Sequence, residues 1–317
     1  MNTIKVYLLD EMSNTPFTFE KGIQYLNKNG IFITQNEKEA NWYVTRFFPF
    51  KSKTDMLFWR IRHRYIPILV WTDEPRFCTI TQNYFKPQIY VPSVHIMNCY
   101  TNDIYINPFC IFGYWAISNK LNYATNETIA HKKSKLVCSL GSYRKEPLFI
   151  NGNNIDLSEY RQNLSIDGYN KGIVDICGPN WPNNIIITQD TRKDKDWHKQ
   201  KLNFIKDYKF NIAIENTLIK YYISEKIWDP ITVGVLPIYY GNQWIYELFK
   251  KDSFIDTNNY HNFKDLFEHI TTMTDEEYLN RLNLCIETYN KAFDSIDFYQ
   301  QYYLMIDNII KKLKTAK

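Results

Sequence analysis

The strongest constraint on the fold is a repeated alternation between short apolar runs and longer segments with helical spacing. Residues 4–9 form the first apolar run, residues 17–28 follow with a helical pattern, and Asn29-Gly30 suits the positive φ that ends a helix. Strands that alternate with helices in this way predict parallel α/β units. The predicted strands are residues 4–9, 31–34, 42–45 and 66–71, then 135–139, 173–178, 210–214 and 235–240.

The predicted strands fall into two series, separated by an irregular, aromatic stretch at residues 101–127. A chain of 317 residues corresponds to two domains at about 100–200 residues each, with one large domain as the alternative. We therefore predict two Rossmann-like α/β lobes facing a cleft. They are an N-terminal lobe at residues 1–130, a C-terminal lobe at 131–300, and a last amphipathic helix at 301–317 that packs back on the N-terminal lobe.

Charge and cysteine patterns exclude several classes of protein. The net charge is only +4 and the basic residues are scattered, whereas a nucleic-acid-binding protein more often shows a basic stripe. The six cysteines form no C-x-x-C pair and no zinc spacing, so we expect free buried thiols in a reducing compartment. The apolar run at residues 4–9 is too short for a signal peptide or a membrane span. These patterns predict a cytoplasmic protein without a transmembrane segment.

The chemistry of the chain gathers around one strand, loop and helix. The buried strand at residues 210–214 runs into Glu215 and Asn216, at the strand end that faces the ligand crevice in parallel sheets. Ser224 is a plausible N-cap, which places Glu225 and Lys226 in the first turn of a helix. A helix N-terminus and a lysine both attract phosphate, and a nearby carboxylate accepts hydroxyl groups. Taken singly, these residues could also be a loop cap and a solvated ion pair.

Three runs of residues resemble the donor-site signature of the α-1,3-fucosyltransferase family, glycosyltransferase family 10. These runs are FNIAIENT at residues 210–217, YISEKIW at 222–228 and GVLPIYYG at 234–241. Weaker similarity extends to SFID at 253–256 and IVDICG at 173–178. The resemblance covers roughly residues 135–285. It implies a GT-B fold, a GDP-fucose donor, an inverting reaction and no metal or other cofactor.

The resemblance also assigns residues to the donor. Asn216, Tyr222, Glu225 and Lys226 match donor-binding positions of the family, and we add Glu215 beside them. An arginine of the family pairs with the diphosphate, and this position is best matched by Arg161, with Arg144 as the rival. Fixed cations at these positions would stabilise the GDP leaving group as it gains negative charge.

A general base must also accept the proton of the attacking hydroxyl. Glu74 follows the strand at residues 66–71, and its surroundings resemble the acid–Ser–Pro element that carries this role in the family. No serine separates Glu74 from Pro75 here, so Asp73 is a rival for the role. An acidic turn before a proline is the alternative without catalytic meaning.

Other features depart from the family pattern. Pro230 lies inside the helix expected after Lys226 and should shorten or kink it. Leu140-Gly141 stands where the family tends to have Ser-Asn, which affects recognition of the nucleotide base. Asp194-Lys195-Asp196 matches the D-x-D metal motif of another transferase class, but it sits in a charged loop and we expect no metal there.

We predict from these observations an inverting, metal-independent hexosyltransferase. It would move fucose from GDP-fucose to a hydroxyl of an acceptor oligosaccharide or glycoconjugate, with an α-1,3 linkage implied by the resemblance. One alternative is the same fold acting on another GDP-sugar. The other is a protein that binds a sugar nucleotide or a glycan without catalysis.

Overall fold

The computed structural model describes residues 3–63, 66–88, 92–110, 119–127, 134–190 and 196–315. The chain divides into two compact units, the first formed by Met1–Cys110 with Ile296–Lys317 and the second by Ile111–Ser295. The predicted boundary between residues 130 and 131 lies in a stretch, 128–133, that is outside the described residues.

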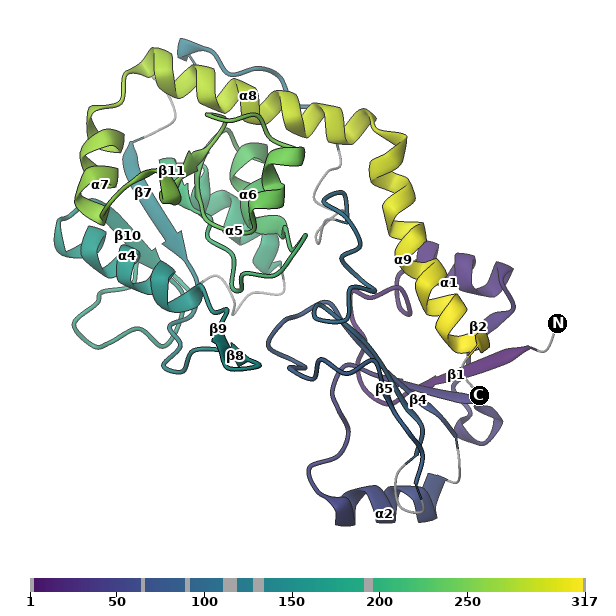
Figure 1. Ribbon diagram of the computed structural model, residues 1–317. Helices are drawn as coiled ribbons and strands as arrows, with labels where there is room; N and C mark the ends of the chain where they lie inside the picture. Colours follow the sequence, from purple (N-terminus) through teal and green to yellow (C-terminus); the bar gives the residue numbers. More distant parts are fainter. Residues whose placement is uncertain are drawn as a thin grey trace. The chain divides into compact units, whose positions relative to one another are not determined.

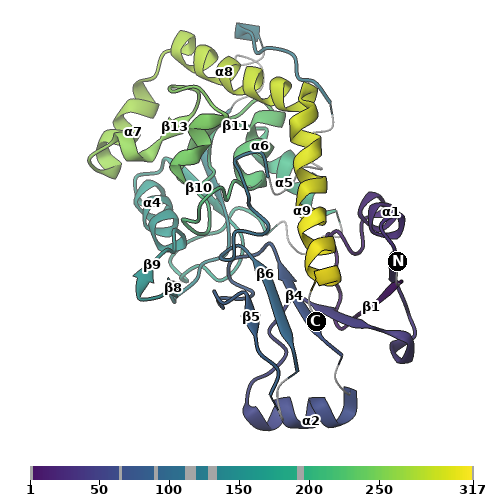
Figure 2. The same cartoon turned by 45° about the vertical axis from the view of Figure 1, so that its right-hand side comes forward.

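The first unit is built on a six-stranded sheet in the order β2-β1-β3-β4-β6-β5. Figures 1 and 2 label several of its strands, among them β1, β4 and β5. Its first five strands run parallel, and β5 pairs antiparallel with β6. Strands β3, β4 and β6 are buried along their whole length, as expected for strands covered on both faces. The strands are β1 (Ile4–Leu8), β2 (Ile31–Ile33), β3 (Trp42–Thr45), β4 (Ile68–Thr72), β5 (Tyr84–Phe85) and β6 (Val94–Asn98). The helices are α1 (Glu20–Lys28), η1 (Glu37–Glu39), α2 (Lys53–His63) and α9 (Ile296–Thr315).

The last helix, α9, packs within the first unit and lies beside α1 in both views (Figures 1 and 2). The ring centroids of Tyr25 and Tyr303 are 4.8 Å apart, and the Tyr25 hydroxyl donates to Asp307 at 3.0 Å. Nearer the C-terminus, the Lys312 ammonium group lies 3.1 Å from the Asp103 carboxylate. The helix therefore ties the end of the chain to elements built from its first 110 residues.

The second unit is built on five parallel strands in the order β10-β7-β11-β12-β13, with a small hairpin of β8 and β9 (Figure 1). The strands are β7 (Lys135–Leu140), β8 (Phe149–Ile150), β9 (Asn153–Asn154), β10 (Val174–Cys177), β11 (Tyr208–Ile212), β12 (Leu236–Tyr239) and β13 (Ile255–Asp256). The helices are α4 (Ser158–Asn170), α5 (Trp197–Ile205), α6 (Glu225–Thr232), η4 (Gln243–Glu247), η5 (Thr257–Asn259), α7 (Phe263–Thr272) and α8 (Asp275–Asp294).

Each of the eight predicted strands is present, and its ends differ by at most two residues from the prediction. Both units are therefore parallel α/β units, as predicted. The strands that the sequence analysis did not identify are short or mixed in polarity. Strand β6, for example, contains His95 and Asn98, which interrupt its apolar pattern although both side chains are buried.

Candidate functional site

The candidate site lies where the carboxyl ends of β7 and β11 meet in the second sheet. The chain continues from β7 to β10 on one side, while β11 pairs with β7 on the other, so the strand order reverses between β7 and β11. Ligands of open parallel sheets bind outside the carboxyl ends of the strands at this point. Glu215 and Asn216 follow β11, and the predicted arginine, Arg161, reaches the same point from α4.

Arg161 and Asn216 are in direct contact. Arg161 is only 5% exposed, and its Nη1 donates to Oδ1 of Asn216 at 3.0 Å and to the carbonyl of Ile214 at 3.1 Å. The start of α4 is held against the same loop, because the Leu157 N–H donates to the carbonyl of Asn216 at 3.0 Å. The structure thus joins two predicted site residues that come from different α/β crossovers.

Two glycines leave space for this arrangement. A Cβ added to Gly141 would stand 3.2 Å from Nη2 of Arg161, so the residue after β7 leaves room for the guanidinium group. Gly178 has a φ of +118°, and a Cβ there would lie 2.5 Å from the Gly141 carbonyl oxygen. The rival arginine, Arg144, has its backbone N–H and carbonyl bound by the side chain of Gln162 at 2.5 and 2.9 Å.

Glu215 is completely buried beside the loop that precedes α6. One carboxylate oxygen accepts the N–H of Ser224 at 2.8 Å and the hydroxyl of Tyr239 at 3.2 Å, and the other accepts the Ser224 hydroxyl at 2.6 Å. Lys226 Nζ lies 3.5 Å away. Burial raises the pKa of Glu215, although Lys226 and the Ser224 hydrogen bonds oppose this effect. The geometry makes Glu215 the residue that orients Ser224.

The N-terminus of α6 is built as the sequence predicted. Ser224 is the N-cap, and its hydroxyl accepts the N–H of Lys226 at 3.4 Å, which leaves Glu225 and Lys226 in the first turn. Pro230 lies inside the helix, which has 8 residues and ends two residues later, at Thr232. Here the Thr232 hydroxyl donates to the carbonyl of Asp229 at 2.7 Å.

Charge at this helix end is arranged around Glu225. Its carboxylate lies 3.7 Å from Lys226 Nζ and 3.5 Å from Lys201 Nζ. Burial acts to raise the pKa of Glu225, but the two lysines and local hydrogen bonds outweigh it and lower this pKa to about 2. Glu225 is therefore ionised at neutral pH, and an ionised carboxylate accepts hydrogen bonds only.

Lys201, which the sequence analysis missed, extends this arrangement from α5. Its Nζ lies 2.6 Å from Asp229 Oδ2, and the other oxygen of this fully buried carboxylate lies 3.1 Å from His198 Nε2. Burial acts to lower the pKa of Lys201, but Asp229 and Glu225 outweigh it and raise the pKa. No motif marks Lys201, because it lies in an ordinary helical pattern before the recognised runs.

Tyr222, the remaining predicted donor residue, is 2% exposed. Its backbone N–H donates to the carbonyl of Ile219 at 3.2 Å, which closes the turn that leads to Ser224. Five of the six predicted donor residues thus join in two contact groups at the carboxyl edge of the sheet, one around Arg161 and Asn216 and one around Ser224. Tyr222 packs within the loop that connects these groups.

The predicted base belongs to the first unit, where Glu74 and Asp73 follow β4. Asp73 is buried, and its backbone carbonyl accepts the Cys99 thiol at 2.8 Å. Glu74 is partly exposed, and its backbone N–H donates to the Thr72 hydroxyl at 3.2 Å. Of the two residues, Glu74 is the more exposed to solvent.

Within the described part of the chain, no group of three or more His, Cys, Asp or Glu side chains could hold a metal ion. Asp194 and Lys195 of the D-x-D match lie outside the described residues, so the absence of a metal stays a prediction. No helix among the described residues is long and apolar enough to cross a bilayer. All six cysteines are free and buried.

The two parallel α/β units have the predicted GT-B fold. The backbone is similar to a crystal structure of an α1,3-fucosyltransferase with GDP-fucose, with a TM-score of 0.52 and 15% identity over 99% of this chain and 91% of that one. Residues 151–284 match the model of the C-terminal domain of glycosyltransferase family 10 (fucosyltransferase). The predicted resemblance to glycosyltransferase family 10 is therefore confirmed for this part of the chain.

Two curated fucosyltransferases are similar to part of this chain. Alpha-(1,3)-fucosyltransferase B of Drosophila melanogaster is 30% identical over 129 residues, which are 39% of this chain and 27% of the relative. GDP-fucose protein O-fucosyltransferase 3 of Gallus gallus is 37% identical over 82 residues, 24% of this chain and 17% of the relative. The chain thus spans about a quarter or less of the length of these relatives.

Proposed function

We propose that this protein transfers fucose from GDP-fucose to a hydroxyl of an acceptor glycan, with inversion, with an α-1,3 linkage and without a metal ion. The observation that carries the proposal is that two contact groups, Arg161 with Asn216 and Glu225 with Lys226, lie at the carboxyl edge of one parallel sheet, in a segment that matches the family 10 model. This arrangement provides cations for a diphosphate and a carboxylate for hydroxyl groups.

In this proposal the diphosphate binds between Arg161 and the N-terminus of α6. The guanidinium group of Arg161 offers a planar set of donors, and Asn216 orients it. Lys226 adds a second cation, which Ser224 holds through a 3.0 Å contact between Nζ and the hydroxyl. Fixed cations stabilise the GDP leaving group as its negative charge develops, and they would do so without a metal.

Glu225 would accept the hydroxyl groups of the ribose, because its carboxylate is ionised and lies at the same helix end. Glu215 and Lys201 act through other residues. Glu215 orients Ser224, and Lys201 holds Glu225 and Asp229. We therefore propose direct donor contacts for Arg161 and Lys226 as well as Glu225, and a positioning role for Glu215.

The reaction also needs a base, and we propose Glu74, with Asp73 as the rival. Removal of a proton by the carboxylate makes the acceptor oxygen a better nucleophile as the anomeric carbon gains positive character. Attack on the face opposite the GDP leaving group inverts the anomeric configuration. The greater solvent access of Glu74 supports its choice over Asp73.

A second acceptor class is supported by the name of the Gallus gallus relative, a protein O-fucosyltransferase. In that case the attacking hydroxyl would belong to a protein side chain. Assays with immobilised oligosaccharides and with peptides rich in serine and threonine distinguish the two acceptors. The donor is the same in both assays, so only the acceptor that becomes fucosylated differs.

Calorimetric titration with GDP, GDP-fucose and GDP-mannose, each with and without EDTA, tests the donor. We expect GDP-fucose to bind in both conditions, and NMR of the product to show an inverted anomeric centre. Tighter binding of GDP-mannose than of GDP-fucose would show that the donor is another GDP-sugar. Binding without transfer would indicate a non-catalytic sugar-nucleotide-binding protein. Loss of transfer with EDTA would refute metal independence. If no GDP-sugar binds, the proposal that the protein is a GDP-sugar-dependent glycosyltransferase is refuted.

Location in the cytoplasm also stays a proposal, supported by the six free buried cysteines. Fluorescence microscopy of the tagged chain in its own cells tests it.

A further inference from the structure

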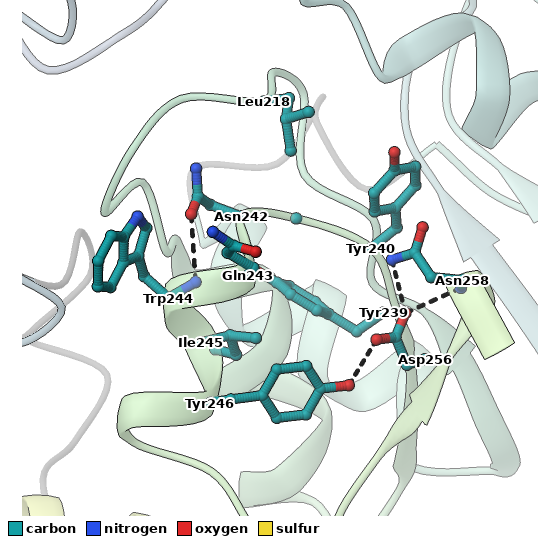
Figure 3. A pocket seen from close by; sticks show the side chains of 11 residues that line it. Leu218, Tyr239, Tyr240, Asn242, Gln243, Trp244, Ile245, Tyr246, Asp256 and Asn258 are labelled. Atoms are coloured by element: carbon teal, nitrogen blue, oxygen red, sulfur yellow. Dashed lines mark hydrogen bonds between the residues drawn. The ribbon is translucent and has the colours of Figure 1, made fainter. Parts of the chain in front are cut away.

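A cavity of about 530 Å³ lies in the same unit as the candidate donor site. It is lined by the last residues of β12 and β13 and by residues that follow these strands, together with Leu218 from the loop between Asn216 and Tyr222 (Figure 3). Tyr239 joins the two sites, because it lines this cavity while its hydroxyl donates to Glu215 at 3.2 Å. Tyr239 therefore connects the cavity with Glu215, which orients Ser224.

The sides of the cavity are aromatic. Figure 3 shows Trp244 on one side and Tyr240 on the other, with the amide side chains of Asn242 and Gln243 between them. Trp244 is half-buried, and Tyr240 packs edge-on against Tyr160 with ring centroids 5.2 Å apart. Rings held in this way offer rigid, apolar faces to a ligand.

The indole of Trp244 is held in place by the residues before Tyr222. The rings of Tyr221 and Trp244 lie with centroids 5.2 Å apart, and Lys220 Nζ lies 4.6 and 5.0 Å from the two centroids. Tyr221 has a φ of 62°, a left-handed conformation that is unfavourable for an aromatic residue. Such strain persists where surrounding contacts require it, and here it places an aromatic ring against Trp244.

The polar part of the cavity consists of amides around one carboxylate. Asp256 accepts the hydroxyl of Tyr246 with one oxygen, and the backbone N–H and side-chain amide of Asn258 with the other at 2.9 and 2.8 Å. Asn242 accepts the N–H of Trp244 at 3.2 Å. These bonds orient side chains that can both donate and accept hydrogen bonds.

The charge of the cavity argues against a phosphate. Asp256 is the one charged side chain among the eleven residues that line it, all of which the structure describes. A carboxylate repels a phosphate, whereas hydroxyl groups can donate to it. A pyranose ring has an apolar C–H face that packs on an aromatic ring and hydroxyl edges that bind amides and carboxylates. Such a ring fits both parts of the cavity.

We propose that this cavity binds a pyranose ring of the acceptor glycan, so that the unit carrying the donor residues also recognises the acceptor. The inference rests on the proposed function, because it takes the ligand to be the second substrate of that reaction. Trp244 supplies the stacking face, and the amides beside it, Asn242 and Gln243, select the hydroxyl pattern.

The test compares wild type with Trp244→Ala and with the conservative Trp244→Phe. Tyr123→Ala, an exposed aromatic of the same unit outside the cavity, is the matched control. Each protein is saturated with GDP and applied to an array of immobilised oligosaccharides that contain galactose, N-acetylglucosamine or mannose. Titration with GDP and GDP-fucose is run in parallel, and thermal unfolding checks that each variant is folded.

We expect the wild type to retain at least one oligosaccharide class, and Trp244→Ala to bind it about tenfold or more weakly. Trp244→Phe and Tyr123→Ala should stay within about threefold of wild type, because each leaves an aromatic face in the cavity. The affinity for GDP should be the same in all four proteins, and so should the affinity for GDP-fucose.

Three results would overturn the inference. In the first, Trp244→Ala binds glycans as tightly as wild type does. In the second, wild type retains no oligosaccharide. In the third, Trp244→Ala loses affinity for GDP-fucose but keeps its affinity for GDP. The last result would place the fucose of the donor in the cavity. Failure of the proposed function is separate, since it would appear as a wild-type protein that does not bind GDP-fucose at all.

Discussion

Arg161 Nη1 donates a hydrogen bond of 3.0 Å to Oδ1 of Asn216, although 55 positions separate the two residues in the sequence. The arginine comes from the first turns of α4, and the amide comes from the loop after β11. Because Arg161 is almost completely buried, its guanidinium group is held in one orientation before any ligand arrives. Preorganised donors of this kind bind a diphosphate with little reorganisation.

Arg161→Lys should weaken GDP binding by about tenfold or more, because lysine keeps the charge and loses the planar set of donors. Calorimetric titration with GDP measures the change. Arg144→Lys is the matched control and should bind GDP as wild type does. The opposite pattern, with a loss only in Arg144→Lys, would show that Arg144 holds the diphosphate.

Glu225→Gln should weaken GDP binding by about tenfold or more, since a hydrogen bond to an ionised acceptor is lost. The same variant should bind 2′-deoxy-GDP almost as wild type does, because that ligand lacks a hydroxyl for the carboxylate to accept. Both affinities come from the same titration series. Equal losses for the two ligands would contradict a contact between Glu225 and the ribose 2′-hydroxyl.

Lys201→Met should destabilise the protein by about 3–5 kcal/mol, because it leaves the buried carboxylate of Asp229 without its cation. Adding Asp229→Asn to this variant should recover much of the loss, since the uncompensated charge is then gone. Urea unfolding at neutral pH measures all three proteins. A double variant no more stable than Lys201→Met would argue against a buried ion pair.

Acid should weaken the fold through Glu225. Burial acts to raise its pKa, but Lys226 and Lys201 outweigh burial and lower it from 4.5 to about 2. A carboxyl group with a depressed folded pKa contributes stability above its unfolded pKa and loses it as pH falls toward the folded value. The difference in unfolding free energy between wild type and Glu225→Gln should therefore be constant above pH 4.5 and shrink below it. Urea unfolding from pH 7 to pH 3 tests this, and a difference that does not change with pH would refute it.

Glu74→Gln should reduce the rate of fucose transfer by about 10²–10⁴-fold if this residue is the base. Binding of GDP should not change, because Glu74 belongs to the first unit and the proposed diphosphate ligands belong to the second. Single-turnover transfer and GDP titration measure the two effects. The Asp73→Asn variant is measured in the same way. A larger loss of transfer rate in that variant than in Glu74→Gln would show that Asp73 is the base.

Local patterns in the sequence determined the strands, the cap and the donor motif. Apolar runs marked the strands because burial requires apolar side chains on both faces of a parallel sheet. Ser224 was recognised as an N-cap, and Pro230 as a limit on α6, because each acts through its own backbone and its neighbours within four residues. Strand β6 was not predicted because the buried polar residues His95 and Asn98 interrupt its apolar pattern.

Only the tertiary structure decided which of these residues touch. The pairing of Lys201 with Glu225, the complete burial of Glu215 and the contact between Arg161 and Asn216 all join separate elements at one edge of the second sheet. Such contacts depend on strand order and on the path of each crossover, and residue spacing does not encode either. The cavity beside Trp244 has the same origin, because its walls come from strands and loops that meet only when the sheet is assembled.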